Sequence, residues 1–404
     1  MSDKMSKPKA LLFVLTVMLS NVCVMADCVI YPITNYIYGA YPESVGTVNW
    51  ILSGPCLLLC LSSLAAPVIL KRISRKQLLV FAAFLFIIGG VGNLFAFESV
   101  LPFAVCRSVV GISQGLTNVV AVAILADAYA DEAKRAKMLG YFNASMNIVG
   151  MICSYICGKM ATVSWQTPFK LYWISIPILI MTVLFVPDFQ KDTDLEQKEE
   201  ALEESLHKDE AKGLGADFWK LMIPAIIFFT AAMINAYFGA VWAEEGGFYD
   251  SVWQGTAGSV GQIVSFILAS LSGAIYLKAR KAMPVFAGFL QIIAFALMIF
   301  FPGEIVIMVN AFFTNAGYIL MFCYAYAVVP DIVPASKTDL AFGFVTAAYS
   351  FGSFLDTYVA TLFMSFTGGS YTAALPIIMG VFILDTLLYI VLTFAGKRKN
   401  SLDN

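Results

Sequence analysis

Four ionisable side chains lie deep inside long apolar stretches of the sequence: Asp27, Arg107, Asp356 and Asp385. Holding a charge at the centre of a membrane helix costs about 2.5–3.5 kcal/mol on insertion scales, so such residues pair with one another or serve a function. An acid and a guanidinium at matching depth form a pair that a proton can open, because protonation removes the charge of the carboxylate. The chemistry that these residue types allow is therefore a proton-responsive charge switch.

Asp27 and Arg107 meet the condition of matching depth. If the N-terminus lies inside, Asp27 is about 25 Å along its helix and Arg107 is about 9 Å from the outer end of its own helix. Both then fall in the outer part of a hydrocarbon core that is ~30 Å thick. We expect the two side chains to pair, and a substrate anion could compete with Asp27 for the guanidinium. A static structural ion pair is the alternative interpretation.

Asp356 has no Lys or Arg at its depth in the second half of the chain. We therefore expect it to be protonated or hydrogen-bonded, which makes it a second candidate for carrying a proton. A neutral, hydrogen-bonded core group is the other interpretation. For Asp385, which lies in the last apolar stretch, we expect a packing role.

Uncharged polar side chains are concentrated on a subset of the apolar stretches. Amide and phenol groups offer hydrogen bonds without a fixed charge, which suits a small polar or amphipathic organic solute. Taken singly, each such residue is more often a hydrogen bond between helices. The candidate binding residues are Tyr31, Gln114, Asn118, Asn147, Asn235, Tyr237, Gln262, Asn315 and Tyr318.

The elements that position these residues are predicted to be membrane-spanning helices. Of the 404 residues 60% are hydrophobic and 13% are charged, with a mean hydropathy of +0.81, whereas soluble domains carry about 25% charged residues. Continuous apolar runs of about 20 residues indicate helices rather than barrel strands. The predicted spans are 10–35, 45–70, 77–97, 101–129, 138–162, 170–187, 218–243, 252–277, 282–301, 303–330, 340–366 and 371–395.

Basic residues fix the predicted orientation. With the N-terminus inside, every Lys and Arg except Arg107, Lys159 and Lys170 falls on the cytoplasmic side, which is the side that such residues prefer. Both termini are then predicted to be cytoplasmic. The first apolar stretch is expected to be retained as an anchor rather than cleaved.

An acidic segment, 188–217, divides the chain into two predicted six-helix bundles, 1–187 and 218–404. This predicted cytoplasmic linker also holds the sole histidine, His207. The halves resemble one another, since 64–88 and 271–293 share a Leu-Lys, an Arg-Lys and the run V-F-A-x-F-L-x-I-I at the same place in each half. Internal repeats of this kind are typical of secondary transporters, which move one half against the other around a central site.

Two short motifs resemble those of the major facilitator superfamily. The segment 67–79 is similar to its loop signature G-x-L-a-D-R-x-G-R-K-x-x-L, with Arg72, Arg75 and Lys76 in place but Lys71 where an acid is expected. The segment 107–115, RSVVGISQG, matches the fourth-helix signature R-x-x-x-G-x-x-x-G. In the fifth helix, Gly150 and Gly158 remain but the Gly-Pro pair of the antiporter branch is missing.

The resemblance implies an all-α membrane protein with twelve transmembrane helices in two pseudo-symmetric six-helix bundles. It also implies secondary transport, with Arg72, Arg75 and Lys76 in a conformational loop. It places the chain nearest to the drug:proton antiporter-like branch, whose fifth-helix signature is degenerate here.

We predict a proton-coupled secondary active transporter of a small organic solute that works by alternating access in the cytoplasmic membrane. Asp27, Arg107 and Asp356 would form its charge switch, with the proton as coupling ion and with no metal or other cofactor. The expected partners are membrane lipid and the solute, without nucleic acid, and the protein is expected to be a monomer.

Three other classes of function are alternatives to this prediction. An organic-anion exchanger or uniporter would use Arg107 to bind a carboxylate. A non-transporting membrane receptor would need a substantial extramembrane domain. An enzyme is not expected, because no span holds a His and no Ser/His/Asp or metal-ligand cluster is evident.

Overall fold

The computed structural model describes residues 7–129, 131–188, 214–334 and 337–399. The predicted acidic linker, 188–217, and its His207 therefore lie largely outside the described residues. Every predicted span coincides with a helix or with a succession of helices, and the described residues contain no strand. The all-α membrane fold expected from the sequence is confirmed.

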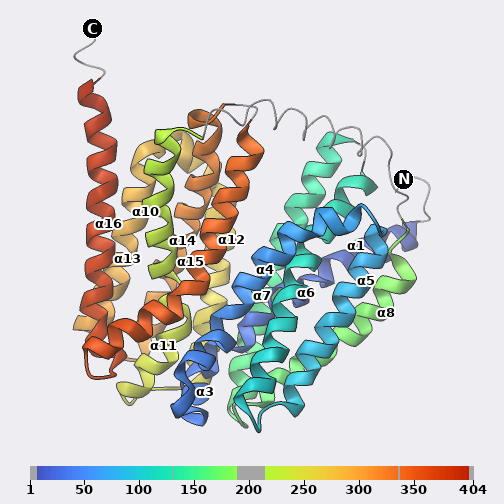
Figure 1. The fold of residues 1–404 in the computed structure, drawn as a ribbon, viewed down its shortest axis with the longest axis horizontal. Coiled ribbons are helices and arrows are strands. Elements are labelled where there is room, and N and C mark those ends of the chain that lie inside the picture. Colours follow the sequence, from blue (N-terminus) through green and yellow to red (C-terminus); the bar gives the residue numbers. More distant parts are fainter. Residues whose placement is uncertain (1–6, 130, 189–213, 335–336, 400–404) are drawn as a thin grey trace. The chain divides into compact units, whose positions relative to one another are not determined.

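The helices of the first half of the sequence are α1 Lys7–Leu19, α2 Asn21–Val24, η2 Ala26–Val29, η3 Tyr31–Ile33, α3 Thr34–Ala40, η4 Pro42–Ser44, α4 Val45–Leu70, α5 Arg75–Phe86, η5 Ile87–Val91, η6 Asn93–Phe95, α6 Val100–Ala128, α7 Glu132–Ala161, η7 Thr167–Ile174 and α8 Ser175–Phe185. Those of the second half are α10 Ala216–Ala232, α11 Ile234–Glu245, α12 Ser251–Ala279, η8 Arg280–Ala282, α13 Met283–Phe300, α14 Glu304–Ile332, α15 Thr338–Phe366 and α16 Tyr371–Lys399 (Figure 1).

Among the described residues, nine helices are long and apolar enough to cross a membrane, or ten if the bent first helix is one span. The two further predicted spans correspond to α7 and α15, which have 30 and 29 residues. Both are long enough to cross, but polar side chains such as Asn143 and Asn147 of α7 and Asp356 of α15 lower their hydropathy. The chain is a multi-pass integral membrane protein.

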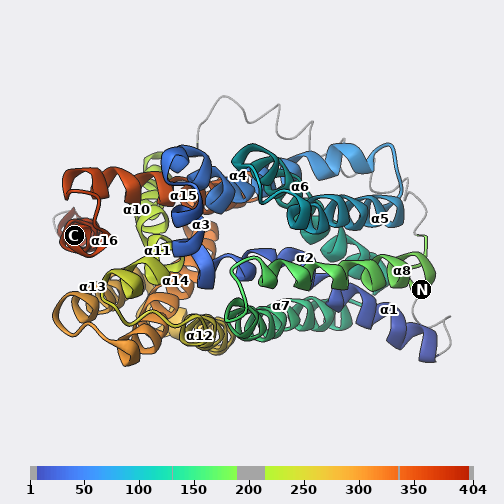
Figure 2. The same ribbon diagram turned by 90° about the horizontal axis from the view of Figure 1, so that it is seen from below.

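The described chain forms two compact units. Unit 1 holds the residues up to 188 together with Tyr237–Glu244 and Tyr249–Ile263, and unit 2 holds the remainder. Within unit 1, α6 packs against both α4 and α5 (Figures 1 and 2). Within unit 2, α13 packs against α14 and α16, while α10 packs against α15. The predicted division into two six-helix bundles stays a prediction.

The sequence predicts one continuous span over 10–35, but the structure divides it into two helical segments. The segments Pro8–Val24 and Ala26–Ala40 meet at 52°. Between them the backbone makes short-range bonds, such as that from the Ile30 amide to the Asp27 carbonyl at 2.9 Å. Pro32 contributes to the break, because it has no amide hydrogen to give to the carbonyl four residues earlier. The break places Asp27 on η2.

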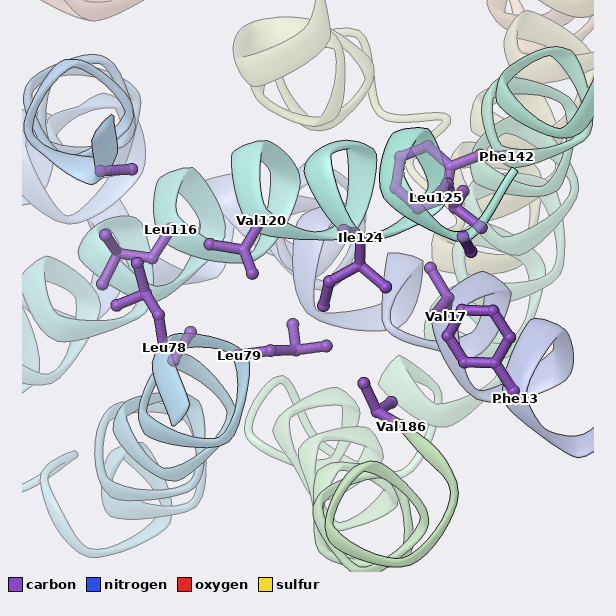
Figure 3. Close-up of a cluster of buried hydrophobic side chains, with 14 residues drawn as sticks. Phe13, Val17, Leu78, Leu79, Leu116, Val120, Ile124, Leu125, Phe142 and Val186 are labelled. Carbon is purple, nitrogen blue, oxygen red and sulfur yellow. The ribbon is translucent and has the colours of Figure 1, made fainter. Parts of the chain in front are cut away.

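An apolar cluster packs helices of unit 1 against one another (Figure 3). Phe13 and Val17 of the first span meet Ile124 of α6 and Phe142 of α7, and each of these side chains is buried. Between helices in a membrane such contacts act through van der Waals packing, because lipid is as apolar as the side chains. The cluster therefore joins the first span, α6 and α7 by close apolar contact.

The two glycines of the fourth-helix motif allow α6 to touch α4. A Cβ atom added at Gly111 would lie 2.6 Å from the Cα and carbonyl oxygen of Pro55, and one at Gly115 would overlap the carbonyl of Leu59. These are backbone atoms, which cannot move away by a change of rotamer as side-chain atoms can. The motif therefore has a packing cause, because small residues let membrane helices approach closely.

Replacing Gly111 by alanine should force α4 and α6 apart and lower stability by about 1–3 kcal/mol, the usual cost of overpacking. The measurement is the apparent unfolding temperature of the purified protein in detergent. Gly140→Ala on α7 is the matched control, since a Cβ there meets nothing within 4 Å. Equal unfolding temperatures for the two variants would contradict this account of the motif.

Helices α7 and α12 also cross at backbone distance within unit 1. A Cβ at Gly158 would lie 2.8 Å from the Cα of Gly255, and Ser259 Oγ donates to the Met151 carbonyl at 2.7 Å. Gly158 is one of the two glycines kept from the fifth-helix signature. The close crossing explains why the first half of α12 belongs to unit 1.

Candidate functional site

Arg107 is the centre of a buried polar site in unit 1. Its side chain is fully buried, and all three guanidinium nitrogens donate hydrogen bonds. Nε bonds the Ile51 carbonyl at 3.1 Å, Nη1 bonds the Tyr172 hydroxyl at 3.2 Å, and Nη2 bonds Asp27 Oδ1. The structure thus brings Asp27 and Arg107 into the ion pair that their depths in the sequence led us to expect.

The second carboxylate oxygen of Asp27 is bonded as well. Gln114, one of the predicted binding residues, donates from Nε2 to Asp27 Oδ2 at 3.2 Å and to the Val24 carbonyl at 3.1 Å. The carbonyl of Ala26 accepts the hydroxyl proton of Tyr172 at 2.9 Å. Two carbonyl oxygens at the break in the first span therefore accept hydrogen bonds from side chains. The Val24 carbonyl accepts from Gln114 of α6, and the Ala26 carbonyl accepts from Tyr172 of η7.

The two members of the ion pair differ in accessibility. The Arg107 side chain is fully buried, whereas 15% of the Asp27 side chain is exposed. Asp27 is therefore the more accessible member of the pair. An anion can reach the guanidinium only if its present bonds are broken, and in a medium of low dielectric those bonds are strong. This arrangement favours proton chemistry at Asp27 over anion binding at Arg107.

Two other predicted residues, Tyr31 and Tyr237, lie together in unit 1. Their rings meet edge to face with centroids 5.2 Å apart, and the Tyr237 hydroxyl lies 3.7 Å from the sulfur of Cys56. Tyr237 is fully buried, and Tyr31 follows the break that carries Asp27. These side chains provide aromatic surface with hydroxyl groups on the same unit as the charge pair.

The remaining predicted residues of unit 1 are dispersed. Asn118 is half-buried, one helical turn beyond Gln114 on α6. Asn147 donates to the carbonyl of Asn143 on its own helix at 3.0 Å. Gln262 approaches Gly150, where a Cβ atom would lie 3.0 Å from its amide carbon. Their predicted part in binding stays a prediction.

In unit 2 the predicted residues divide between two settings. Asn235 donates to Asn310, and Asn315 donates to the carbonyl of Ala311 in its own helix at 2.9 Å. Tyr318 instead packs its ring against aromatic neighbours, with centroid distances of 5.9 Å to Phe229 and 6.0 Å to Tyr349. The contacts of Asn235 and Tyr318 join helices, whereas that of Asn315 stays within α14, and none of them by itself forms a binding site.

Asp356 and Asp385, the two acids of unit 2 that lie deep in predicted spans, are both buried. Asp356 on α15 accepts a bond from the backbone amide of Thr357. Asp385 on α16 has one carboxylate oxygen with no hydrogen-bond partner among the described residues. A proton-carrying role for Asp356 and a packing role for Asp385 both stay predictions.

The predicted conformational loop joins α4 to α5. Arg75 at the start of α5 forms an ion pair with Asp127 near the end of α6, and Ser74 caps α5 by accepting from the Gln77 amide at 3.3 Å. Arg72 is exposed and Lys76 is half-buried. One basic residue of the loop is thus paired with an acid of α6.

A tyrosine outside the spans contacts the broken first helix. Tyr249, between α11 and α12, donates to the Pro32 carbonyl at 2.6 Å and packs edge to face on Tyr36 at 5.4 Å. Burial, and then the nearby Tyr36, Glu244 and Asp250, raise the pKa of the Tyr249 phenol. The phenol therefore keeps its proton, and this hydrogen bond, at physiological pH.

Tyr172 was missed by the sequence analysis. Tyr172 lies near the start of a predicted span with few polar residues, and such a span gives no reason to expect a residue of the site. The available signal was its depth, since Tyr172 and Arg107 each lie a few residues inside the predicted outer end of their spans. No group of three or more His, Cys, Asp or Glu side chains that could hold a metal occurs among the described residues.

Comparison with known proteins identifies the relatives of this chain. The model of the Major Facilitator Superfamily matches residues 14–355. The arabinose-proton symporter of Escherichia coli (strain K12) is 26% identical over 142 residues, which cover 35% of this chain and 29% of that relative. The match with this relative thus spans less than a third of the relative's length.

Solved structures resemble the fold over almost the whole chain. A bacterial homolog to the human lysosomal transporter Spinster, inward-facing and occupied, has a TM-score of 0.76 at 14% identity and covers 96% of this chain and 97% of that one. A POT family transporter in complex with 5-aminolevulinic acid has a TM-score of 0.73 at 14% identity, covering 96% of each chain. A D-xylose-proton symporter has a TM-score of 0.68 at 14% identity, covering 94% and 97%. At these identities the likeness concerns the fold alone, and the comparisons together point to a transporter rather than an enzyme.

Proposed function

Since the chain belongs to the major facilitator superfamily, we propose that it is a secondary active transporter that couples a small organic solute to protons by alternating access. The observation that carries the proposal is the buried pair of Asp27 and Arg107 at the break in the first span. Protonation of Asp27 would remove the charge that holds the guanidinium, so the bonds of the site would rearrange. The cytoplasmic membrane is the proposed location.

The coupling step follows from the bonds around Asp27. With the carboxylate charged, Arg107 and Gln114 each hold one of its oxygens and keep the broken helix against α6. A proton on either oxygen weakens the bond to the cation, because the attraction between opposite charges is lost. The broken helix is then free to move, and Asp27 would give up its proton when the pair forms again.

The proposed solute is uncharged overall and of small size. The charge pair is neutral as a whole, and the polar side chains nearby are amides and phenols. The similarity to an arabinose-proton symporter and to a D-xylose-proton symporter supports pentoses as first candidates and protons as the coupling ion. An organic-anion exchanger has less support, because every nitrogen of Arg107 is already bonded within the protein.

The test is transport by the purified full chain in proteoliposomes. Labelled L-arabinose, D-xylose, a dipeptide and 5-aminolevulinic acid are offered with and without an imposed pH gradient. We expect at least one solute to accumulate only when the gradient is present. Movement of an organic anion by exchange, indifferent to the gradient, would contradict proton coupling. Failure of every solute to move in correctly folded protein would instead favour the receptor interpretation.

A further inference from the structure

Three buried oxygen atoms on α2 and α6 lack partners in the part of the chain that the structure describes. They are Asn21 Oδ1, Gln114 Oε1 and Thr117 Oγ1, and the three side chains are 0%, 0% and 1% exposed. A buried acceptor without a hydrogen bond costs about 1–3 kcal/mol. Such groups are usually satisfied by internal water, which makes about three hydrogen bonds in a polar site.

Asn21 belongs to α2, and Gln114 and Thr117 belong to α6, which packs against α2. The hydrogen bond from Gln114 to the Val24 carbonyl fixes the two segments against each other. The segments run antiparallel, because Asp27, three residues after Val24, meets Arg107, seven residues before Gln114. Residues three apart share one face of a helix. Asn21 and Thr117 are therefore each one turn from the Val24–Gln114 bond, on the side away from Asp27.

The polar side chains continue from Asn21 of α2 to α7. The amide nitrogen of Asn21 donates to Ser145 Oγ at 2.8 Å and to the Phe142 carbonyl at 3.1 Å, so its oxygen is the acceptor that remains. Ser145 is half-buried, whereas the apolar cluster lies beyond it around Val17 and Phe142 (Figure 3). A polar route from Asp27 thus leaves through Ser145 and is closed by hydrocarbon further along.

We infer that Asn21, Gln114 and Thr117 bind a file of internal water that carries the coupling proton between Asp27 and Ser145. The inference rests on the proposed proton coupling. A proton that arrives at the Ser145 end passes from water to water, each of which takes one proton and gives one up. It ends on the Asp27 carboxylate, and no water is consumed.

The titratable groups around this route are few. Arg107 and Tyr172 face Asp27 on the side opposite to the water file, and Tyr237 adds a phenol near the guanidinium. Cys28, next to Asp27 in the chain, lies near Cys153 of α7. The buried thiol of Cys23 lies on α2 between Asn21 and Val24. In the segments 21–27, 107–117 and 142–145, Asp27 and Arg107 are the only Asp, Glu, His, Lys or Arg residues, so water is the carrier that we propose.

The test compares two isosteric substitutions in proteoliposomes, with labelled D-xylose as the probe or the best-transported member of the solute panel in its place. Thr117→Val removes the orphan hydroxyl and should slow uptake driven by a pH gradient about fivefold to tenfold. Counterflow, in which labelled solute exchanges for unlabelled solute without a pH gradient, should stay within about twofold. Thr182→Val is the control, because its equally buried hydroxyl already donates to the Ile178 carbonyl at 2.8 Å.

Each outcome of this test either supports or overturns the proposed water file. Equal gradient-driven uptake by the Thr117 and Thr182 variants would overturn the water file, and proton coupling would stand provided that Asp27→Asn abolishes such uptake. If Thr117→Val lowered both uptake and counterflow, Thr117→Ser would separate the causes. A serine that restores gradient-driven uptake supports the role of the hydroxyl, and a serine as slow as valine shows a packing effect and overturns the inference.

Discussion

Asp27→Asn abolishes accumulation of solute driven by a pH gradient, while solute still equilibrates across the membrane. Asparagine keeps the size of the side chain and one acceptor oxygen for Arg107, but it cannot take up or release a proton. The carrier then has no group at the break in the first span whose charge follows pH. The measurement is the ratio of internal to external labelled solute in proteoliposomes with the inside and outside held at different pH.

Two further acids serve as comparisons for this result. Asp385→Asn removes a buried acid for which we predict a packing role, so gradient-driven accumulation should persist. Asp356→Asn tests the second titratable candidate, and accumulation should fall if that residue carries a proton. Accumulation by the Asp27 variant equal to that of the unmodified protein would contradict the proposed switch.

Arg107→Met lowers the stability of the protein by about 3–5 kcal/mol, the cost found when one partner of a buried pair is removed. The Asp27 carboxylate loses its cation, and the Ile51 carbonyl and the Tyr172 hydroxyl lose their donor at the same time. Methionine replaces the aliphatic stem of arginine and carries no charge, so the variant loses the charge and the three hydrogen bonds of the guanidinium together. The apparent unfolding temperature in detergent reports the effect.

A double substitution separates the ion pair from the other bonds of Arg107. Asp27→Asn combined with Arg107→Met should be destabilised by less than the sum of the two single changes, because residues in contact do not act independently. The remainder reflects the bonds to Ile51 and Tyr172. If the single effects simply added, the two charges would not stabilise each other.

The fold was predictable because each span is a continuous apolar run, and every predicted run is helical in the structure. The ion pair was predictable because charges are rare in lipid and must find one another at equal depth. The glycines of α6 were recognised through the resemblance of 107–115 to a family motif, although only the structure shows that Gly111 and Gly115 are needed for contact with Pro55 and Leu59.

The details that depend on tertiary contacts could not be read from the sequence. The continuous apolar run 10–35 did not reveal the 52° bend that presents Asp27. Tyr172 acquires its role only where the break meets η7. Asn147 and Asn315 were predicted binding residues because amides are polar; each donates to a carbonyl of its own helix, and their part in binding stays a prediction. Polarity alone does not distinguish a side chain facing a solute from one that bonds its own backbone.

The most direct test measures proton movement itself. Proteoliposomes in weak buffer, with no pH gradient at the start, receive D-xylose or the best-transported member of the panel, and external pH is recorded as the solute enters. We predict a pH change of either sign that grows with the amount of solute moved and is absent for Asp27→Asn. Entry of solute without a pH change in the unmodified protein, or an undiminished change in the asparagine variant, would contradict the assignment of Asp27 as the proton-carrying residue.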